Sequence, residues 1–318
     1  MYSGLVEIHR EILCFVSPFI SSHLAVMRSV MLPDMKRRPS VAIVGPGNLG
    51  AALAVSLRGA GYVIEAVIGR QLPPSLKRAK ELAEEVGTRA QASFEHSKAK
   101  IVWLTVPDRD IASTSAVLAK SLSKGRGLIA FHSSGVLNSD EMEAFRKKGV
   151  ALASVHPLMT FVRDSRPSLV GVPFAIEGDR RAVRTARQIV RDLGGQPYQI
   201  RKKDKTAYHA WATFASPLLT ALLVTAQRVA RNAGISDLEA KRRMIPIVLQ
   251  TVANYAAFGA DEAISGPIVR GDVATVEKHL QALRKVPVAR SVYLSLASAA
   301  LQYLPNKKSA RLRRILQG

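Results

Sequence analysis

Apolar residues in the first 200 positions fall into short runs, separated by longer segments with helical periodicity. The short runs predict strands at 41–44, 62–68, 101–106, 128–131, 150–155, 173–177 and 197–200. The segments between them predict helices at 51–57, 76–86, 111–122, 142–148 and 181–193. Strands that alternate with helices in this way predict an α/β domain with an open, parallel sheet.

Beyond the basic stretch at 201–205 the strands stop and only helical patterns remain. A long pattern covers 206–232 and is expected to bend at Pro217, because proline cannot donate a backbone hydrogen bond. Further helices are predicted at 240–258, 273–283 and 288–301. The second part of the chain is therefore predicted to be all-helical.

The domain boundaries follow from this change of pattern. We predict an α/β domain at 39–200 and a helical domain at 201–318, with a basic, weakly attached tail from Lys307. Residues 1–38 fit neither domain. Their apolar run is short, contains a proline and precedes no small-residue cleavage site. We expect a loose extension or a start assigned too early, with a signal peptide or membrane anchor as the alternative.

Charge narrows the choice of ligand. Lys and Arg number 46 against 24 Asp and Glu, a net charge of +22, and such a field favours phosphates and carboxylates. The charge is scattered in pairs such as Arg180–Arg181, which is typical of a solvated surface, and no nucleic-acid motif accompanies it. We expect neither a specific nucleic acid nor a membrane as partner. The single cysteine, Cys14, excludes an internal disulfide and indicates a cytoplasmic location.

The first predicted strand runs directly into Gly45-Pro46-Gly47-Asn48-Leu49-Gly50, the pattern Gly-x-Gly-x-x-Gly. A strand, this glycine turn and a helix form the dinucleotide-binding fingerprint. Gly45 would allow the sharp turn, Gly47 the approach of a pyrophosphate, and Gly50 close packing of helix on strand. The cofactor would also contact Asn48 and Leu49. The alternative is a glycine-rich turn without a cofactor.

Arg70 stands twenty positions beyond the last glycine, after the second predicted strand. An NAD site places a carboxylate there for the ribose 2′-hydroxyl, whereas an arginine suits the 2′-phosphate of NADP. The sequence therefore favours NADP over NAD, the alternative being a solvated arginine. Val106 and Pro107 follow the strand at 101–106 and are expected beneath the cofactor.

Together these features resemble the 6-phosphogluconate dehydrogenase-like superfamily, which includes pyrroline-5-carboxylate reductases, prephenate dehydrogenases and F420-dependent NADP oxidoreductases. More narrowly, the chain is similar to uncharacterised Rossmann-like proteins with a DUF2520 domain. The matching stretches are 41–50, 106–108, 132–135, 156–161, 208–210, 265–267 and 270–272. The resemblance implies a Rossmann NAD(P)-binding domain followed by a helical substrate and dimerisation domain. It implies no particular substrate.

Polar residues follow two predicted strands of the sheet. Prephenate dehydrogenases carry a similar His-Pro pair and a preceding serine, which implies roles for His156 and for Ser134 or Ser133. A histidine suits acid–base work near neutral pH, and the serines could bind nicotinamide or substrate. The alternatives are a buried histidine and a turn of small polar residues. His132 stands closer to its strand and is a weaker candidate.

Lys205 and His209 are four residues apart and would share one face of a helix. Related dehydrogenases place a catalytic lysine at the start of this helix, although their full lysine-to-asparagine pattern is lacking here. Arg270 could clamp a substrate carboxylate, or pair structurally with Asp272. Such loops reach the partner's cleft in the superfamily, which implies a homodimer through the helical domain.

These observations predict an NADP-dependent oxidoreductase that transfers hydride between nicotinamide and a small anionic carbonyl, imine or hydroxy substrate. His156 and His209 are expected to face one cleft. No metal is expected, because the sequence has no histidine or cysteine cluster at ligand spacing. The alternative function is an NADP-binding sensor or scaffold without turnover.

Overall fold

The structure is a computed structural model that describes residues 38–318, apart from 71, 95–96, 164, 306–309 and 318. The chain divides into two compact units, Met1–Lys205 and Thr206–Gly318. Most of the predicted N-terminal extension, 1–37, lies outside the described residues.

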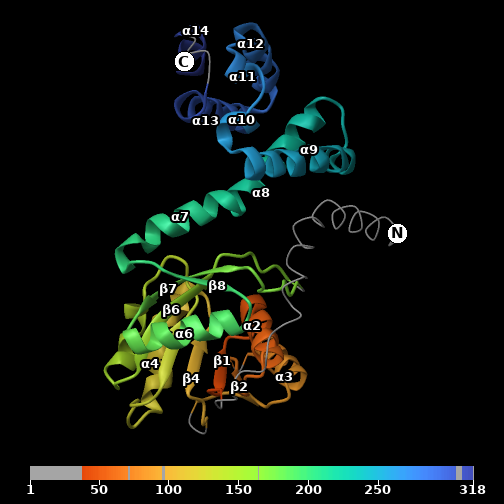
Figure 1. Ribbon diagram of the computed structural model, residues 1–318. Helices are drawn as coiled ribbons and strands as arrows, with labels where there is room; N and C mark the ends of the chain where they lie inside the picture. Colours follow the sequence, from red (N-terminus) through yellow and green to blue (C-terminus); the bar gives the residue numbers. More distant parts are fainter. Residues whose placement is uncertain (1–37, 71, 95–96, 164, 306–309, 318) are drawn as a thin grey trace, which may run out of the picture. The chain divides into compact units, whose positions relative to one another are not determined.

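The first unit contains a sheet of eight strands in the order β3-β2-β1-β4-β5-β6-β7-β8 (Figure 1). The strands are β1 Val41–Val44, β2 Ile64–Ile68, β3 Ala90–Gln91, β4 Ile101–Leu104, β5 Ile129–His132, β6 Ala151–Pro157, β7 Pro173–Gly178 and β8 Gln196–Gln199. Neighbouring strands are parallel, except that β6 and β7 are antiparallel. The predicted α/β class is therefore confirmed.

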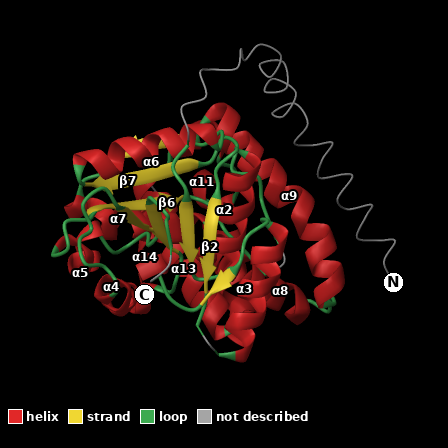
Figure 2. Ribbon diagram, turned by 90° about the horizontal axis from the view of Figure 1, so that it is seen from below, coloured by secondary structure: helices red, strands yellow, loops and turns green. Residues whose placement is uncertain are grey.

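Helices cover both faces of this sheet (Figure 2). They are α2 Asn48–Gly59, α3 Pro73–Glu85, α4 Asp108–Lys120, α5 Glu143–Arg146 and α6 Arg180–Asp192, with short 3₁₀ turns at Ser139–Met142 and Lys202–Asp204. Along β1, Val41 and Ile43 face α2, α3 and α6, whereas Ala42 and Val44 face α4 and α5. Because both faces are covered, the strand is apolar at every position.

The second unit is helical. Its helices are α7 Lys205–Ala215, α8 Pro217–Asn232, α9 Asp237–Phe258, α10 Ala260–Ala263, α11 Pro267–Arg270, α12 Val273–Ala282, α13 Pro287–Tyr303 and α14 Ala310–Gln317, with a 3₁₀ turn at Leu283–Lys285. The predicted long helix is broken at Ser216, and Pro217 begins α8 at the position where proline is tolerated. By length and composition alone, Lys202–Asn232 could cross a membrane, since an 18-residue window within it has a mean hydropathy of 1.3.

The C-terminal tail differs from its prediction. Leu312 and Leu316 of α14 are buried in an apolar cluster with Val276 and Leu280 of α12 and Leu301 of α13. The expectation of a weakly attached tail was therefore wrong. The prediction relied on the many basic residues of this segment and overlooked two leucines. These leucines are four positions apart and therefore share one face of the helix.

Candidate functional site

The glycine turn lies between the end of β1 and the start of α2. Gly45 has a φ of +104°, and a Cβ there would lie 2.9 Å from the backbone of Thr105. A Cβ on Gly50 would lie 2.1 Å from the carbonyl oxygen of Gly45. The Thr105 hydroxyl closes this packing by donating to the same carbonyl at 2.7 Å. Both positions therefore require glycine.

Gly47 differs from these two glycines. It precedes α2 as the N-cap residue, and no atom lies within 4 Å of the place where its Cβ would stand. The first turn of a helix presents backbone N–H groups without intrahelical partners and carries a partial positive charge. This open space at a helix N-terminus fits a phosphate, which a side chain at position 47 would displace.

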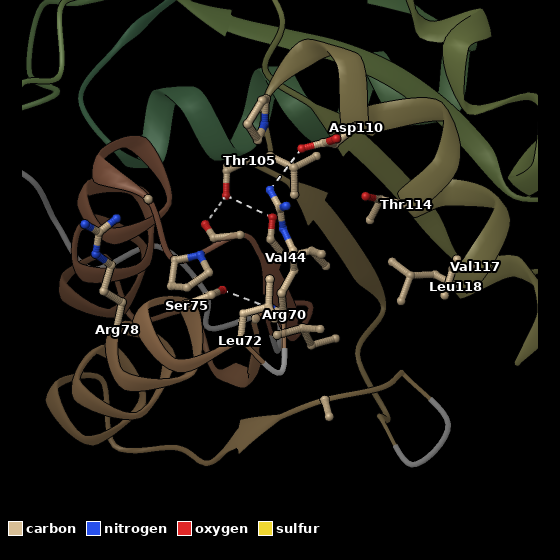
Figure 3. Close-up of a pocket in the computed structure, with 18 of the residues that line it drawn as sticks. Val44, Arg70, Leu72, Ser75, Arg78, Thr105, Asp110, Thr114, Val117 and Leu118 are labelled. Carbon is tan, nitrogen blue, oxygen red and sulfur yellow. Dashed lines mark hydrogen bonds and ion pairs between the residues drawn. The ribbon is translucent and has the colours of Figure 1, made fainter.

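A cavity of about 680 Å³ opens beside the turn at the carboxyl ends of β1, β2 and β4 (Figure 3). The residues around it belong to the turn, to α3 and to α4. Among those that line it are Gly45, Gly47, Arg70, Ser75, Arg78, Thr105, Val106, Pro107, Asp110, Ser113 and Thr114. Ligands of open α/β sheets bind at this edge.

Arg70 reaches across this cavity. Its Nη2 donates to Asp110 Oδ2 on α4 at 3.0 Å, and its backbone N–H donates to Ser75 Oγ at the start of α3 (Figure 3). Arg78 on α3 also lines the cavity. Ser75, Arg78 and Asp110 were not predicted from the sequence, although a helix start directly after Arg70 was a usable signal for an anion site.

The end of β5 is closed and internally bonded. His132 is fully buried, accepts the Ser134 N–H at Nδ1, and has Nε2 2.9 Å from the Asn138 carbonyl oxygen. Because Nδ1 accepts, the proton is on Nε2 and the ring is neutral. Burial lowers the pKa of His132 to about 4, which keeps it neutral at physiological pH.

The two serines after β5 have internal partners as well. Ser133 Oγ accepts a hydrogen bond from the indole N–H of Trp103 at 2.8 Å. Ser134 Oγ donates to Asp108 Oδ2 at 2.8 Å and accepts the Leu137 N–H at 2.9 Å. Direct contact of Ser134 with a ligand would require it to exchange these partners.

Lys205, the first residue of α7, joins the ends of β5 and β6. Its side chain is 1% exposed, and Nζ donates to the Ser134 carbonyl oxygen at 2.9 Å and to Ser154 Oγ at 2.7 Å. Burial lowers the pKa of Lys205 to about 8, although the carboxylates of Glu177 and Asp108 oppose this shift. Lys205 thus holds two strand ends together.

Glu177 lies in the same buried region. Its carboxylate accepts the Ser139 N–H at 2.7 Å and the Ser139 hydroxyl at 3.0 Å. Burial raises the pKa of Glu177 above its usual value, and the positive charge of Lys205 counteracts the shift.

His156 stands near the end of β6, opposite Ala175 of β7, and is half-buried. The loop that follows leads back to the glycine turn, where Asn48 Nδ2 donates to the Phe161 carbonyl oxygen at 3.1 Å. The structure therefore links the segment after His156 to the phosphate cradle, which lies three strands away in the sheet.

Two predicted residues lie in the second unit. His209 is half-buried on α7, one turn after Lys205. Arg270 is the exposed last residue of α11, and the Asp272 carboxylate caps α12 by accepting the N–H and hydroxyl of Thr275. Asp272 thus has a structural role. No cluster of potential metal ligands occurs among the described residues of either unit.

Two protein families match the chain. The Rossmann-like family matches residues 30–157, and DUF2520, a domain of unknown function, matches 172–300. The second match begins within the sheet, at β7. Among curated proteins, no sequence matches the chain.

Solved structures share the fold. A Bacteroides fragilis protein, provisionally assigned as an NADP oxidoreductase, has a TM-score of 0.68 at 19% identity, over 82% of this chain and 97% of that one. Protein TM1727 of Thermotoga maritima has a TM-score of 0.63 at 24% identity, over 87% and 98%. An imine reductase of Myxococcus stipitatus, in complex with NADP⁺, has a TM-score of 0.62 at 15% identity, over 88% and 100%.

The resemblance stated from the sequence is confirmed by these matches for both domains and for the fold. The chain therefore contains a Rossmann-like domain followed by a DUF2520 domain, and it shares the fold of these solved structures.

Proposed function

We propose that this protein is an NADP-dependent oxidoreductase acting on a small anionic carbonyl, imine or hydroxy substrate. The observation that carries the proposal is the cavity beside the glycine turn, which combines an open phosphate cradle at Gly47 with Arg70 after β2 and Arg78 on α3. Solved neighbours named as NADP complexes support a cofactor of this class.

The turn from Gly45 to Gly50, including Asn48 and Leu49, would hold the pyrophosphate with its backbone. Arg70 and Arg78 would bind the 2′-phosphate, while Val106 and Pro107 would support the cofactor from β4. When bound, the dinucleotide supplies or accepts the hydride. The protein orients the reacting carbon and manages one proton.

The Arg70–Asp110 pair affects the choice of cofactor. A 2′-phosphate would compete with Asp110 for the guanidinium, since Asp110 already accepts a hydrogen bond from Arg70 Nη2. NADP binding would therefore weaken the Arg70–Asp110 ion pair. Arg78, which lines the same cavity, would offset this loss by providing a second cation for the phosphate.

His156 is our first choice for the proton donor or acceptor, because its strand leads into the loop bonded to Asn48. His209 is the second histidine proposed to contact substrate, and Arg270 is proposed to bind a substrate carboxylate. Ser134 and Lys205 are better described as positioning residues, since their polar atoms fix the ends of β5 and β6. Ser133 remains a proposed substrate contact.

A homodimer through the helical unit is part of this proposal. No residue of α8 is buried, and Leu218, Leu219, Leu222 and Val224 are exposed along it. Leu218, Leu219 and Leu222 share one face of the helix, and an exposed apolar face of this kind is typical of a protein interface. Light scattering would show twice the chain mass if the proposal holds. We also propose a soluble, cytoplasmic protein.

An NADP-binding sensor without turnover is the second candidate. It is favoured by the internal bonding of Ser133, Ser134 and Lys205, which occupies polar groups that an enzyme would offer to its substrate. Both functions require the cofactor cradle, so binding alone does not separate them.

Titration with NADPH and NADH, followed by nicotinamide fluorescence, tests the shared step. Binding of neither cofactor would refute both candidates, and tighter binding of NADH would remove the role of Arg70. Consumption of NADPH is then measured with a library of ketoacids, aldehydes and imines. Turnover of any member supports the enzyme, and binding without turnover supports the sensor.

A further inference from the structure

Helix α6 carries a stripe of arginines. Arg180, Arg184, Arg187 and Arg191 follow one another at spacings of four, three and four residues, so their side chains leave the same face of the helix. At 1.5 Å per residue the stripe extends over about 16 Å. Figure 1 shows α6 lying across the sheet, whose edge strand is β8. The charge interpreted from the sequence as scattered is therefore aligned here.

These arginines line a second cavity of about 590 Å³. Gly178 of β7, Val183 of α6 and Gln199 of β8 complete its lining, and no carboxylate belongs to it. It shares no lining residue with the dinucleotide cavity. Four like charges beside one concavity repel one another, which favours a ligand of high negative charge.

Arg187 provides a second, independent observation. Its Nε is buried and has no hydrogen-bond partner among the described residues. A buried donor without a partner is destabilising, and native structures rarely retain one unless a water or ligand satisfies it. Arg187, which also lines the groove, therefore has a donor that no described protein group satisfies.

Two other arginines on or near α6, Arg181 and Arg146, have protein partners. Arg181, the neighbour on α6, donates to the Leu128 carbonyl oxygen at 2.8 Å. Arg146 bonds Asp179 and Asp140. No salt bridge joins any of the four stripe arginines to an acidic side chain among the described residues. The stripe arginines thus differ from Arg181 and Arg146 in their bonding partners among the described residues, although all are the same residue type.

We propose that this groove is a second anion site, which binds a linear polyphosphate, free or carried by a nucleoside. Arginine forks bind phosphate oxygens in a bidentate manner, and a chain of linked phosphates carries several anionic oxygens that neighbouring guanidinium groups of the stripe could share. A single carboxylate would satisfy only one of the four cations. The site is independent of the cofactor and of the reaction proposed above.

The test is calorimetric titration of the full chain with inorganic triphosphate at physiological salt, with and without excess NADPH. Arg184→Gln/Arg187→Gln is expected to weaken binding about 10- to 100-fold, since each lost charge-assisted bond is worth roughly tenfold. Arg242→Gln/Arg243→Gln on α9 removes the same charge elsewhere and is expected to change affinity less than about threefold. ATP serves as the nucleoside-bound form.

The fold of each variant is checked by its thermal midpoint, and Arg184→Lys/Arg187→Lys separates charge from bidentate geometry by losing an intermediate amount of affinity. The proposal is overturned if wild type does not bind triphosphate, or if both glutamine variants weaken binding equally. It is also overturned if Arg70→Ala or excess NADPH abolishes binding, which would assign the triphosphate to the dinucleotide cavity. Preferential binding of a single-stranded oligonucleotide through the same arginines would replace it with a nucleic-acid site.

Discussion

Two regions at the carboxyl ends of parallel strands in one sheet differ in how their polar groups are used. Beside β1 and β2, Gly47 faces open space and Arg70 and Arg78 line a cavity. Beside β5, the side chains of Ser134 and Lys205 are buried and bonded to the protein itself. The same edge of a sheet can thus provide a binding site at one place and a rigid support at another.

His156 tests whether the closed region takes part in chemistry. If it moves the proton, His156→Ala should lower kcat about 10²–10⁴-fold, because positioned acid–base catalysis contributes this much, while NADPH affinity stays unchanged. His209→Ala is expected to act in the same way. Steady-state kinetics on the substrate found by the library provide the measurement. His279→Ala, which removes a histidine bonded to Tyr293 on the helical unit, is the control. An unchanged rate per folded molecule would exclude His156.

Substitutions at two glycines test the open region beside β1. Gly47→Val should weaken NADPH binding on the order of 100-fold or more, a loss of about 3 kcal/mol, because its side chain would occupy the phosphate position. Its thermal midpoint should change little, since the side chain meets no protein atom. Gly50→Ala should instead lower the free energy of unfolding by about 1–3 kcal/mol through overpacking against Gly45. The reverse pattern would contradict the proposed cradle.

Lys205 tests the rigid support through pH. Its pKa is about 8 in the folded protein, against the usual lysine value of 10.5 in the unfolded chain, so the unfolded chain binds more protons between these values. This group should therefore add stability as pH rises from about 8 to 10.5, by on the order of 3 kcal/mol in total. Urea unfolding of wild type and Lys205→Met across this range measures the difference. If both proteins show the same pH dependence, folding does not lower the pKa of Lys205 and the prediction is wrong.

Arg70 tests the cofactor choice. Arg70→Ala should weaken NADPH binding about tenfold while NADH binding stays nearly constant, because only NADPH carries the 2′-phosphate. Arg78→Ala should show a smaller loss of the same kind if both cations share the phosphate. Fluorescence titration with each cofactor gives the ratio. Equal losses for both cofactors would indicate a general effect on the cavity.

Asp110 provides the smallest expected change. Asp110→Asn removes the carboxylate that bonds Arg70 and should tighten NADPH binding about two- to fivefold, since the phosphate no longer competes with it. The affinity for NADH should stay unchanged, because NADH has no 2′-phosphate. Weaker NADPH binding in this variant would mean that Asp110 positions Arg70 for the cofactor.

Much of the fold could be predicted because its signals are local. The runs at β1 and β4 are apolar throughout, since both sheet faces are covered, and Gly45 and Gly50 mark a turn that other residues cannot adopt. Strand β3, with two residues, is too short to leave a pattern. The C-terminal tail was wrongly predicted to be weakly attached, because the prediction relied on its charge. Its two buried leucines pack against residues of α12 and α13, which are distant in the sequence.

The sequence named candidate site residues, and the structure shows which of them are buried and bonded to the protein. His156 and Ser134 were identified because they follow predicted strands, although β6 extends to Pro157 and includes His156. Lys205 was identified near the start of the predicted long helix. That Lys205 is buried follows from contacts with residues 51 and 71 positions earlier, which no local pattern encodes. Ser75 and Arg78 were missed because α3 brings them to Arg70 only once the helix packs on β2.

The sequence by itself determined the alternation of strands and helices, the glycine turn and the spacing of the arginines on α6, because periodicity and backbone conformation are properties of neighbouring residues. Only the tertiary structure decided which polar groups find partners. Lys205 is bonded to Ser134 and Ser154, whereas the Nε of Arg187 has no partner among the described residues. The reason is physical: burial and hydrogen bonding depend on what distant segments bring to a side chain, and these long-range contacts set its charge, its pKa and its availability to a ligand.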